Sequence, residues 1–201
     1  MRRLTCIALF LWTSIASAVE IPTGGTPIRL DITNTSIVSW HMNNGNVTSC
    51  DDDLGAGIER LNLNGSWESW VMGVRMDGAL YYPAPQPRVA TATFDRCLAT
   101  ELTSRYQNSI VPEKLWAGWN GRTFEITAGD SYVSFGRGLT LSLRKTDELG
   151  LDTTQRGLRV RMNTDRFSST LVAGLTNINN VDEASGRWED DPNDAIIGAT
   201  A

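Results

Sequence analysis

The sequence predicts an all-β protein, and three observations support this. Apolar residues alternate with polar ones in several stretches, which is the period of a strand with two unlike faces. Turn-forming residues separate these stretches, and helical periodicity is hard to find. We expect an antiparallel transmembrane β-barrel, of which this chain is the N-terminal portion. The alternative is a soluble β-sandwich, since alternation alone does not choose between the two.

The start of the chain has the features of a secretory signal peptide. Arg2 and Arg3 precede an apolar run from Leu4 to Ile15, which is too short to span a bilayer. The small residues at 16–18 fit the A-x-A pattern that signal peptidases cleave. We therefore predict that residues 1–18 are a signal peptide cleaved after Ala18, and that residues 19–201 belong to the barrel.

Charge and cysteine content limit the partners of the exported chain. The 18 basic and 23 acidic residues become 16 and 23 once the two signal arginines are removed, which is a net charge of -7. Nucleic acid is therefore not an expected partner, because phosphate binding needs a basic face. We expect Cys50 and Cys97 to form a disulfide in an oxidising compartment. No metal site and no cofactor are expected.

The first strands after the signal have one apolar and one polar face. They are "PIRLDIT" at 27–33 and "SWVMGVRMDG" at 69–78. The apolar members are Ile28, Leu30 and Ile32 in the first stretch and Trp70, Met72, Val74 and Met76 in the second. Arg29, Asp31, Arg75 and Asp77 share the opposite faces with small residues.

Two hairpins follow, and their turns set the expected registers. Asn120-Gly121 is favoured in two-residue turns, and Thr164-Asp165 takes the same place in the second hairpin. The expected apolar pairs are Leu115 with Ile126 and Leu158 with Leu171. In both hairpins the apolar side chains then meet on one face, whereas a shift of one residue would mix the faces.

The stretch from Phe124 to Arg144 changes its apolar parity at Gly129-Asp130. One interpretation is a wall strand that ends near Tyr132, a glycine-rich bend at "FGRGL", and a further wall strand at "LTLSLR". The other is a two-residue hairpin at Gly129-Asp130. Both preserve the alternation.

Four features favour the barrel over the sandwich, and the export signal is the first of them. Aromatic residues lie near expected strand ends, namely Trp116, Trp119, Tyr81 and Tyr82. Arginines and small hydroxyl residues occupy the strand positions that would face the lumen of a barrel. Short turns alternate with long polar stretches at 83–112, 145–157 and 176–194, as they do in outer-membrane barrels. The final residues "AIIGATA" begin a strand at Ala195, so we expect further strands beyond this portion.

The segment from Ala128 to Gly157 also carries a recognisable pattern. Its members are Gly129, Asp130, Tyr132, Phe135, Gly136, Gly138, Leu139, Leu143, Arg144, Leu149, Gly150, Asp152, Arg156 and Gly157. This pattern resembles an uncharacterised family, a domain of unknown function, of bacterial outer-membrane porin-like β-barrel proteins. The resemblance implies a location in the cell outer membrane and brings no established substrate or catalytic residue.

We therefore expect a porin-like barrel with a passive transport or scaffold role and no enzymatic activity. The candidate lumen charges are Arg137, Arg144, Arg159 and Arg161. Arginines in a water-filled passage favour anions, so the expected partners are outer-membrane lipid and small anionic solutes. The solute and the oligomeric state are left open.

Two alternatives belong to other functional classes. One is a secreted or surface binding protein of the β-sandwich type, without catalytic activity. The other is a secreted glycoside hydrolase, because that chemistry needs only two carboxylates, such as Glu125 and Asp130.

Overall fold

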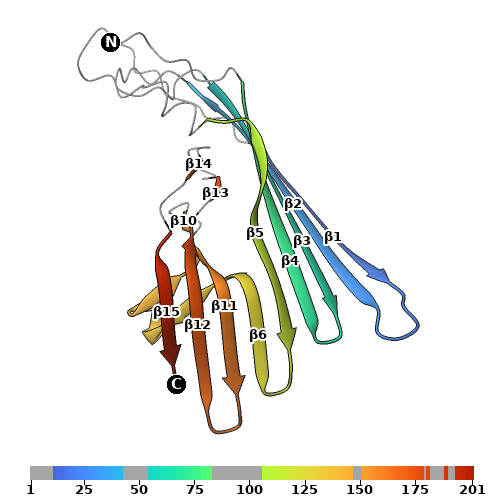
Figure 1. Cartoon of the computed structure of the whole chain (residues 1–201). Helices are drawn as coiled ribbons and strands as arrows, with labels where there is room; N and C mark the ends of the chain where they lie inside the picture. The colour runs from blue at the N-terminus through green and yellow to red at the C-terminus, as the bar shows by residue number, and fades with distance from the viewer. Residues whose placement is uncertain are drawn as a thin grey trace, which may run out of the picture.

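The structure is a computed structural model that describes residues 11–42, 54–82, 106–146, 151–178, 180–181, 188–189 and 193–201. Its main feature is an antiparallel nine-stranded sheet with the order β1-β2-β3-β4-β5-β6-β11-β12-β15 (Figure 1). Strands that neighbour one another in the sheet also follow one another along the chain. The described residues include no helix that is long and apolar enough to cross a membrane.

The sheet strands are long on the N-terminal side and shorter toward the C-terminus. They are β1 (Leu11–Ile21), β2 (Ile28–His41), β3 (Leu54–Trp67), β4 (Trp70–Tyr82), β5 (Ser109–Asn120), β6 (Phe124–Ser131), β11 (Thr154–Asn163), β12 (Ser168–Asn177) and β15 (Ala195–Thr200). Three small two-stranded sheets are separate from it. They pair β7 (Val133–Phe135) with β8 (Leu141–Leu143), β9 (Lys145–Thr146) with β10 (Leu151–Asp152), and β13 (Asn180–Val181) with β14 (Trp188–Glu189).

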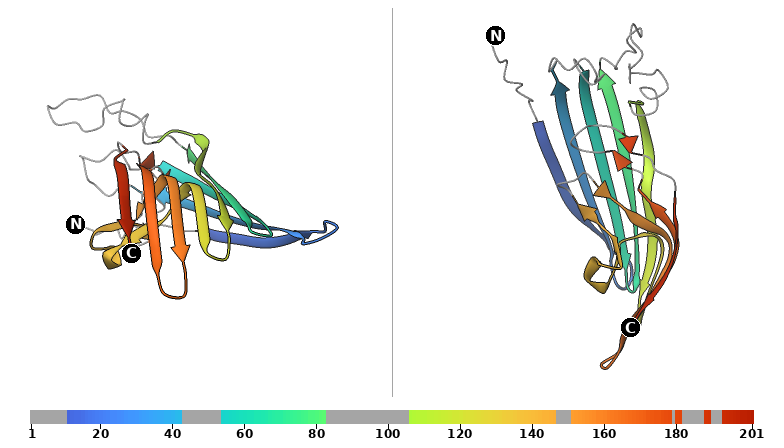
Figure 2. Two further views of the ribbon diagram at one scale, coloured as in Figure 1. Left: turned by 60° about the horizontal axis from the view of Figure 1, so that its bottom comes forward. Right: turned by 90° about the vertical axis from the view of Figure 1, so that its left-hand side faces the viewer.

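The sheet is curved and open, with β1 and β15 at its two edges (Figure 2). We call the face that the small sheets contact the inner face, and the opposite face the outer face. Arg60, Arg75, Lys114 and Arg159 lie on the inner face, and Leu63, Met72, Leu115 and Leu158 lie on the outer face. The all-β prediction is therefore confirmed, and the sheet is antiparallel as expected.

Both predicted hairpins form, but each turn is longer than expected. In the first, the Gly121 amide donates to the Phe124 carbonyl at 2.8 Å, and Trp119 pairs with Ile126. In the second, the Thr164 amide donates to the Phe167 carbonyl at 2.8 Å, and Leu158 pairs with Ala173.

The expected pairs Leu115 with Ile126 and Leu158 with Leu171 are therefore wrong. The register shifts are even, however, so every apolar side chain keeps its predicted face.

Strand β6 continues through Gly129-Asp130, so the alternative two-residue hairpin at this position is wrong. Gly129 pairs with Gly157 of β11 and has a φ of 101°, a conformation that L side chains rarely adopt. Asp130 is the next residue, and its carboxylate accepts a hydrogen bond from the Leu115 amide of β5 at 2.9 Å. The parity change in the sequence thus reflects a local distortion of one strand.

The glycine-rich segment after Tyr132 bends away from the wall, as expected, but the segment that follows does not return to it. β7 and β8 form a hairpin that lies on the inner face, with the 3-10 turn η1 (Gly136–Gly138) at its tip. Phe135 packs with Val133 and Val172, and a Cβ at Gly198 would lie 2.7 Å from its ring. The wall strand expected at "LTLSLR" is therefore wrong, because β8 pairs with β7 in a two-stranded sheet that is separate from the main sheet.

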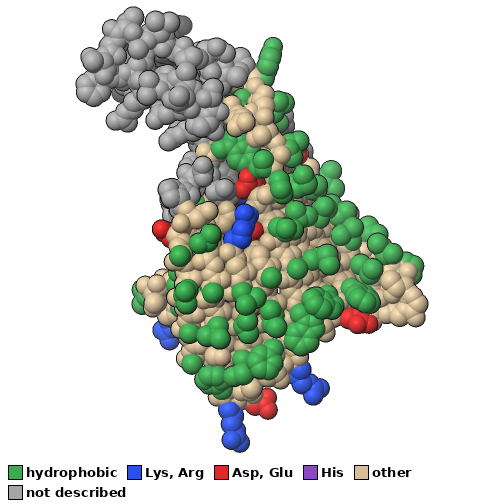
Figure 3. Space-filling view, in the orientation of Figure 1, with side chains coloured by type: hydrophobic (Ala, Val, Ile, Leu, Met, Phe, Trp, Pro, Cys, Tyr) green, Lys and Arg blue, Asp and Glu red, His purple; other side chains and the backbone are tan. Residues whose placement is uncertain are grey.

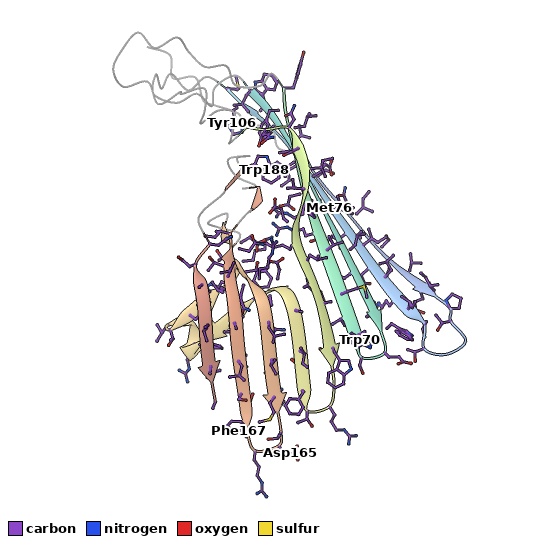
Figure 4. All side chains as sticks on the ribbon, viewed as in Figure 1. Trp70, Met76, Tyr106, Asp165, Phe167 and Trp188 are labelled. Atoms are coloured by element: carbon purple, nitrogen blue, oxygen red, sulfur yellow. The ribbon has the colours of Figure 1, made fainter. Side chains whose placement is uncertain are left out.

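The inner face also has an apolar cluster near the ends of β2, β3 and β4. Its buried members are Ile37, Leu54, Ala56, Ile58, Ala79, Tyr81 and Tyr106. Trp188 of β14 packs against the cluster, and its indole nitrogen donates to the Gln107 carbonyl at 3.0 Å (Figure 4). The β13–β14 hairpin is thereby fixed to the inner side of the sheet.

The structure does not test two predictions on the N-terminal half. Leu11–Ile21 pairs with β2 in the chain that still carries its first residues, so cleavage after Ala18 stays a prediction. Cys50 and Cys97 lie outside the described residues, and their disulfide also stays a prediction.

Candidate functional site

A cluster of buried charges lies on the inner face between β3, β4 and the β9–β10 hairpin. Asp77, which is fully buried, accepts from Arg60 at 3.1 Å and from Arg75 at 2.9 Å. Arg75 also forms an ion pair with Asp152 of β10, which lies outside the main sheet. The cluster therefore ties the β9–β10 segment to the wall.

Lys114 of β5 connects the same segment to β11 and β12. Its ammonium donates to the Asp152 carbonyl at 3.0 Å, to the Thr154 hydroxyl at 3.2 Å and to the Asn177 carbonyl at 3.0 Å. Lys114 is 5% exposed, so these three acceptors replace the water that the ammonium loses on burial.

Asp130 holds the strands β5, β6, β11 and β12 together at one point. Its carboxylate accepts from Thr154 at 3.0 Å, from Asn177 at 2.8 Å and from Arg156 at 3.1 Å, besides the Leu115 amide. These donors occupy both carboxylate oxygens. The carboxylate that was considered for glycoside hydrolysis is thus engaged within the wall.

Tyr132 and Asp152 lie in segments that connect the wall strands. The Tyr132 hydroxyl donates to Asp152 at 2.7 Å. Burial by itself raises the pKa of Asp152, but Arg75, Lys114 and this hydrogen bond outweigh it and hold the pKa below its usual value. Burial and the Asp152 carboxylate raise the pKa of Tyr132, so the pair consists of a carboxylate and a neutral phenol at neutral pH.

The segment that resembles the porin-like family contributes several residues to this cluster. Asp130, Tyr132, Asp152 and Arg156 all take part in the hydrogen bonds described above. The pattern residues at 135–139 belong instead to the β7–β8 hairpin. The spacing of the pattern thus corresponds to a wall strand, an inward hairpin and a return to the wall.

A cavity of about 640 Å³ lies on the inner face beside the charge cluster. One part of its lining is the cluster itself, including Arg60, Arg75, Lys114, Asp130 and Tyr132. The other part is supplied by wall residues nearer the short turns, namely Asn62, Asn64, Trp116, Asn120, Glu125, Thr127 and Arg159. The cavity therefore combines cations, carboxylates, amides, hydroxyls and an indole.

A row of glycines crosses the sheet at the level of this cavity. Gly73 pairs with Trp116, Trp116 with Gly129, Gly129 with Gly157, and Gly157 with Gly174. A Cβ at Gly129 or Gly157 would lie 2.2 or 2.1 Å from a backbone oxygen of the neighbouring strand. We call these four glycines the glycine row. The strands approach one another here more closely than side chains would allow.

The four predicted lumen arginines fall into two pairs. Arg159 and Arg161 lie on the inner face of β11, where Arg159 donates to the Tyr132 carbonyl at 3.1 Å and to the Thr127 hydroxyl at 3.2 Å. Arg161 lies 3.9 Å from Glu125. Arg137 and Arg144 lie instead on the β7–β8 hairpin and the segment after it, exposed, and Arg137 has a φ of 59°. All four are therefore on elements of the inner side.

The outer face is rich in exposed hydrophobic side chains (Figure 3). Leu80, Leu171 and Ile197 are 61, 54 and 89% exposed. Charged side chains are found at the hairpin tips, where Glu68, Arg122, Asp165 and Arg166 are exposed.

Aromatic residues border this outer face at both ends of the strands. Trp67, Trp70, Phe124 and Phe167 lie near the short turns and are 44 to 52% exposed, and Trp40 and Tyr82 lie at the opposite end. Figure 4 shows Trp70 and Phe167 near the short turns. Of the aromatic residues expected near strand ends, Tyr81 and Tyr82 lie at the end of β4 and Trp119 lies next to the end of β5, whereas Trp116 lies further inside β5. Trp116 and Tyr81 lie on the inner face.

The sequence does not predict the inner cluster as a unit. Arg75, Asp77 and Lys114 alternate with apolar residues in their strands, and this alternation indicates that they share the polar face of the sheet. Their partner Asp152 lies in a stretch without periodicity. Within the described ranges, no group of three or more His, Cys, Asp or Glu side chains could hold a metal ion.

Comparisons with protein-family models, with curated proteins and with solved structures find no match to this chain.

Proposed function

We propose that the chain is part of an outer-membrane, porin-like β-barrel whose outer face contacts lipid and whose inner face lines a passage for small solutes. The observation that carries this proposal is the contrast between the two faces. Hydrophobic side chains on the outer face are exposed, whereas Arg60, Arg75, Lys114 and Arg159 all lie inside. Exposed hydrophobic side chains on the outer face are compatible with lipid. Each Arg or Lys that faced lipid at the midplane would instead destabilise the protein by about 2 to 4 kcal/mol.

The spacing of the outer aromatic residues supports a membrane band. Trp70 and Tyr82 lie at opposite ends of β4, twelve residues apart. A strand rises about 3.3 Å per residue, and a tilt of about 35 to 45° would leave about 28 to 33 Å between the two side chains along the membrane normal. This agrees with a hydrocarbon core of about 30 Å.

The positions of the small sheets support a barrel over a sandwich. In a sandwich, a second sheet would cover the apolar face. Here β7–β8, β9–β10 and β14 make their contacts with the inner face, through Phe135, Asp152 and Trp188. Nothing in the described ranges covers the outer hydrophobic residues.

The proposal requires that both edges of the sheet acquire further strand partners, at β15 on one side and at β1 on the other, or at β2 where residues 1–18 have been cleaved. An open sheet edge in lipid leaves backbone groups without hydrogen bonds, at several kcal/mol each. The partner strands would come from the same polypeptide or from another copy of it.

The test is extraction and gel mobility of the protein expressed in a Gram-negative host. A barrel stays in the outer-membrane fraction until detergent is added, and it migrates differently before and after boiling. A secreted binding protein or a secreted hydrolase would be recovered in the aqueous fraction and would contradict the proposal.

Within this function, Arg159 and Arg161 support a preference for anions, since arginines lining a water-filled passage attract them. The measurement is reversal potential across a planar bilayer under a salt gradient. Anion selectivity that falls in the double variant Arg159→Ser, Arg161→Ser supports the passage. Identical selectivity in both proteins would mean that these arginines only stabilise the wall, as Arg161 does through its contact with Glu125.

A further inference from the structure

We propose that the inner cavity contains a binding subsite for a sugar ring that carries a carboxylate, such as a uronate. This inference rests on the proposed function, because it names the solute class that the passage would hold. It is carried by Trp116, by the amide side chains around it and by Arg159. All of these residues line the same cavity of about 640 Å³.

Trp116 provides a flat apolar surface in a lining whose aliphatic members are Val71 and Val74. Its indole lies against Gly73, where a Cβ would be 2.5 Å from the indole nitrogen and 2.7 Å from Cε2. The absence of a side chain at Gly73 thus lets the ring lie along the wall. The C–H groups on one face of a pyranose ring stack on such an indole face.

Amide and hydroxyl groups surround this indole. Asn64 lies beside it, since its Oδ1 would be 2.5 Å from the same Cβ at Gly73. Asn62, Asn120 and Thr127 line the cavity from neighbouring strands, which are about 4.8 Å apart in a sheet. Each amide both donates and accepts hydrogen bonds, and sugar hydroxyls do the same. A simple inorganic anion would leave these groups unused.

Arg159 is the group suited to a carboxylate. Two of its donors are used by the Tyr132 carbonyl and the Thr127 hydroxyl, which fix the guanidinium in place. Among the described residues, no carboxylate lies within ion-pair distance of Arg159, whereas Arg75 and Arg156 both have one. Its remaining donors would bind a ligand carboxylate, in two parallel bonds where the orientation allows.

Glu125 lines the same cavity and would repel an anion placed next to it. Its carboxylate lies 3.9 Å from Arg161 on the side nearer the turns. We therefore place the ligand carboxylate at Arg159, with the ring over Trp116. Glu125 would then face ring hydroxyls, for which it is an acceptor.

The experiment is saturation-transfer difference NMR on the purified protein in deuterated detergent, titrated with galacturonate, methyl galactoside and acetate. Galacturonate should bind at least fivefold more tightly than either of the other probes. Trp116→Leu should weaken galacturonate binding about tenfold. Arg159→Gln should lower it to the level of methyl galactoside, because the contact that distinguishes galacturonate from this probe is the one with its carboxylate.

Trp70→Leu is the matched control, since Trp70 is 52% exposed on the outer face. This variant should bind galacturonate as the unchanged protein does. Boiled and unboiled samples of every variant on a gel show whether each one is folded. Should Trp116→Leu fail to fold, Gly73→Ser replaces it, because a Cβ there displaces the indole.

The inference would be overturned if galacturonate bound saturably with the same affinity to the Trp116→Leu and Arg159→Gln variants. It would also be overturned if acetate bound as tightly as galacturonate. A protein that conducts ions but binds none of the three probes would also overturn it while the proposed function stands. Conversely, a protein found only in the aqueous fraction that binds galacturonate through Trp116 would refute the membrane role and keep the subsite.

Discussion

The guanidinium of Arg75 forms an ion pair with the carboxylate of Asp152, although 77 residues separate them in the chain. Arg75 stands on a wall strand, and Asp152 stands on the short β10 strand outside the main sheet. Because Arg75 also binds Asp77 of its own strand, one side chain joins the wall to a segment that crosses the inner face.

Asp77→Asn should destabilise the fold by about 3 to 5 kcal/mol, the usual cost of breaking a buried ion pair. The substitution leaves Arg60 and Arg75 without their shared carboxylate, on an inner face where they are 6 and 7% exposed. Urea unfolding followed by tryptophan fluorescence gives the free energy. Asp31→Asn is the control, because its pair with Arg29 is exposed and should change stability by no more than about 1 kcal/mol.

The contribution of Asp152 should depend on pH. Its pKa is lowered in the folded chain, so its ionised form stabilises the fold above its unfolded value, about pH 3.9, and this stabilisation is lost as the pH falls through the folded value. Asp152→Asn should therefore be less stable than the unchanged protein at pH 7, and the difference should shrink steadily at more acidic pH. A difference that stays constant down to pH 2 would mean that the carboxylate charge is irrelevant.

Gly129→Ala should destabilise the fold by at least about 1 to 3 kcal/mol, the cost of a strained backbone conformation. The residue has a φ of 101°, and a Cβ would meet the Leu115 carbonyl oxygen at 2.2 Å. Gly25→Ala is the control, because a Cβ there has nothing within 4 Å. Equal stability of the two variants in urea unfolding would contradict the strain assigned to Gly129.

Leu171→Arg should impair folding into lipid vesicles, while Thr33→Arg should not. Leu171 is 54% exposed on the outer face, and Thr33 lies on the inner parity of β2. A lipid-facing arginine costs up to about 4 kcal/mol, whereas an exposed substitution in water usually changes stability by less than about 0.5 kcal/mol. The folded fraction is read from gel mobility without boiling. A similar folded fraction for both variants would argue that the outer face meets water.

The exported protein should begin at Val19. Cleavage after Ala18 would remove most of the residues that form β1 and leave β2 as the edge strand of the described sheet. N-terminal sequencing of protein from the outer-membrane fraction decides the matter. A chain that still begins at Met1 would refute the cleavage.

Side-chain facing could be predicted from the sequence, but strand pairing could not. Alternation assigns each residue to a face without reference to any partner, so Leu158 and Arg159 are on the predicted sides. Pairing depends on turn length, and the turns at Gly121 and Thr164 are longer than the dipeptides indicate. The shifts preserve the faces because they involve an even number of residues.

The charge cluster shows a second limit of the sequence. Arg75, Asp77 and Lys114 are recognisable as inner residues from strand parity alone. Asp152 and Asn177, which complete their hydrogen bonds, come from segments beyond the next wall strands. No local pattern relates these positions, so only the curvature of the sheet brings them together.

The glycine row implies that substitutions along it will not act independently. Gly129, Gly157 and Gly174 are paired in succession, and each would press a new methyl group into the backbone of an adjacent strand. Gly157 and Gly174 crowd the same pair of strands, β11 and β12, so a methyl group at one position would separate these strands and relieve the crowding that a methyl group at the other would meet. The double variant Gly157→Ala, Gly174→Ala should therefore lose less stability than the sum of the two single variants, so this part of the glycine row responds as one unit.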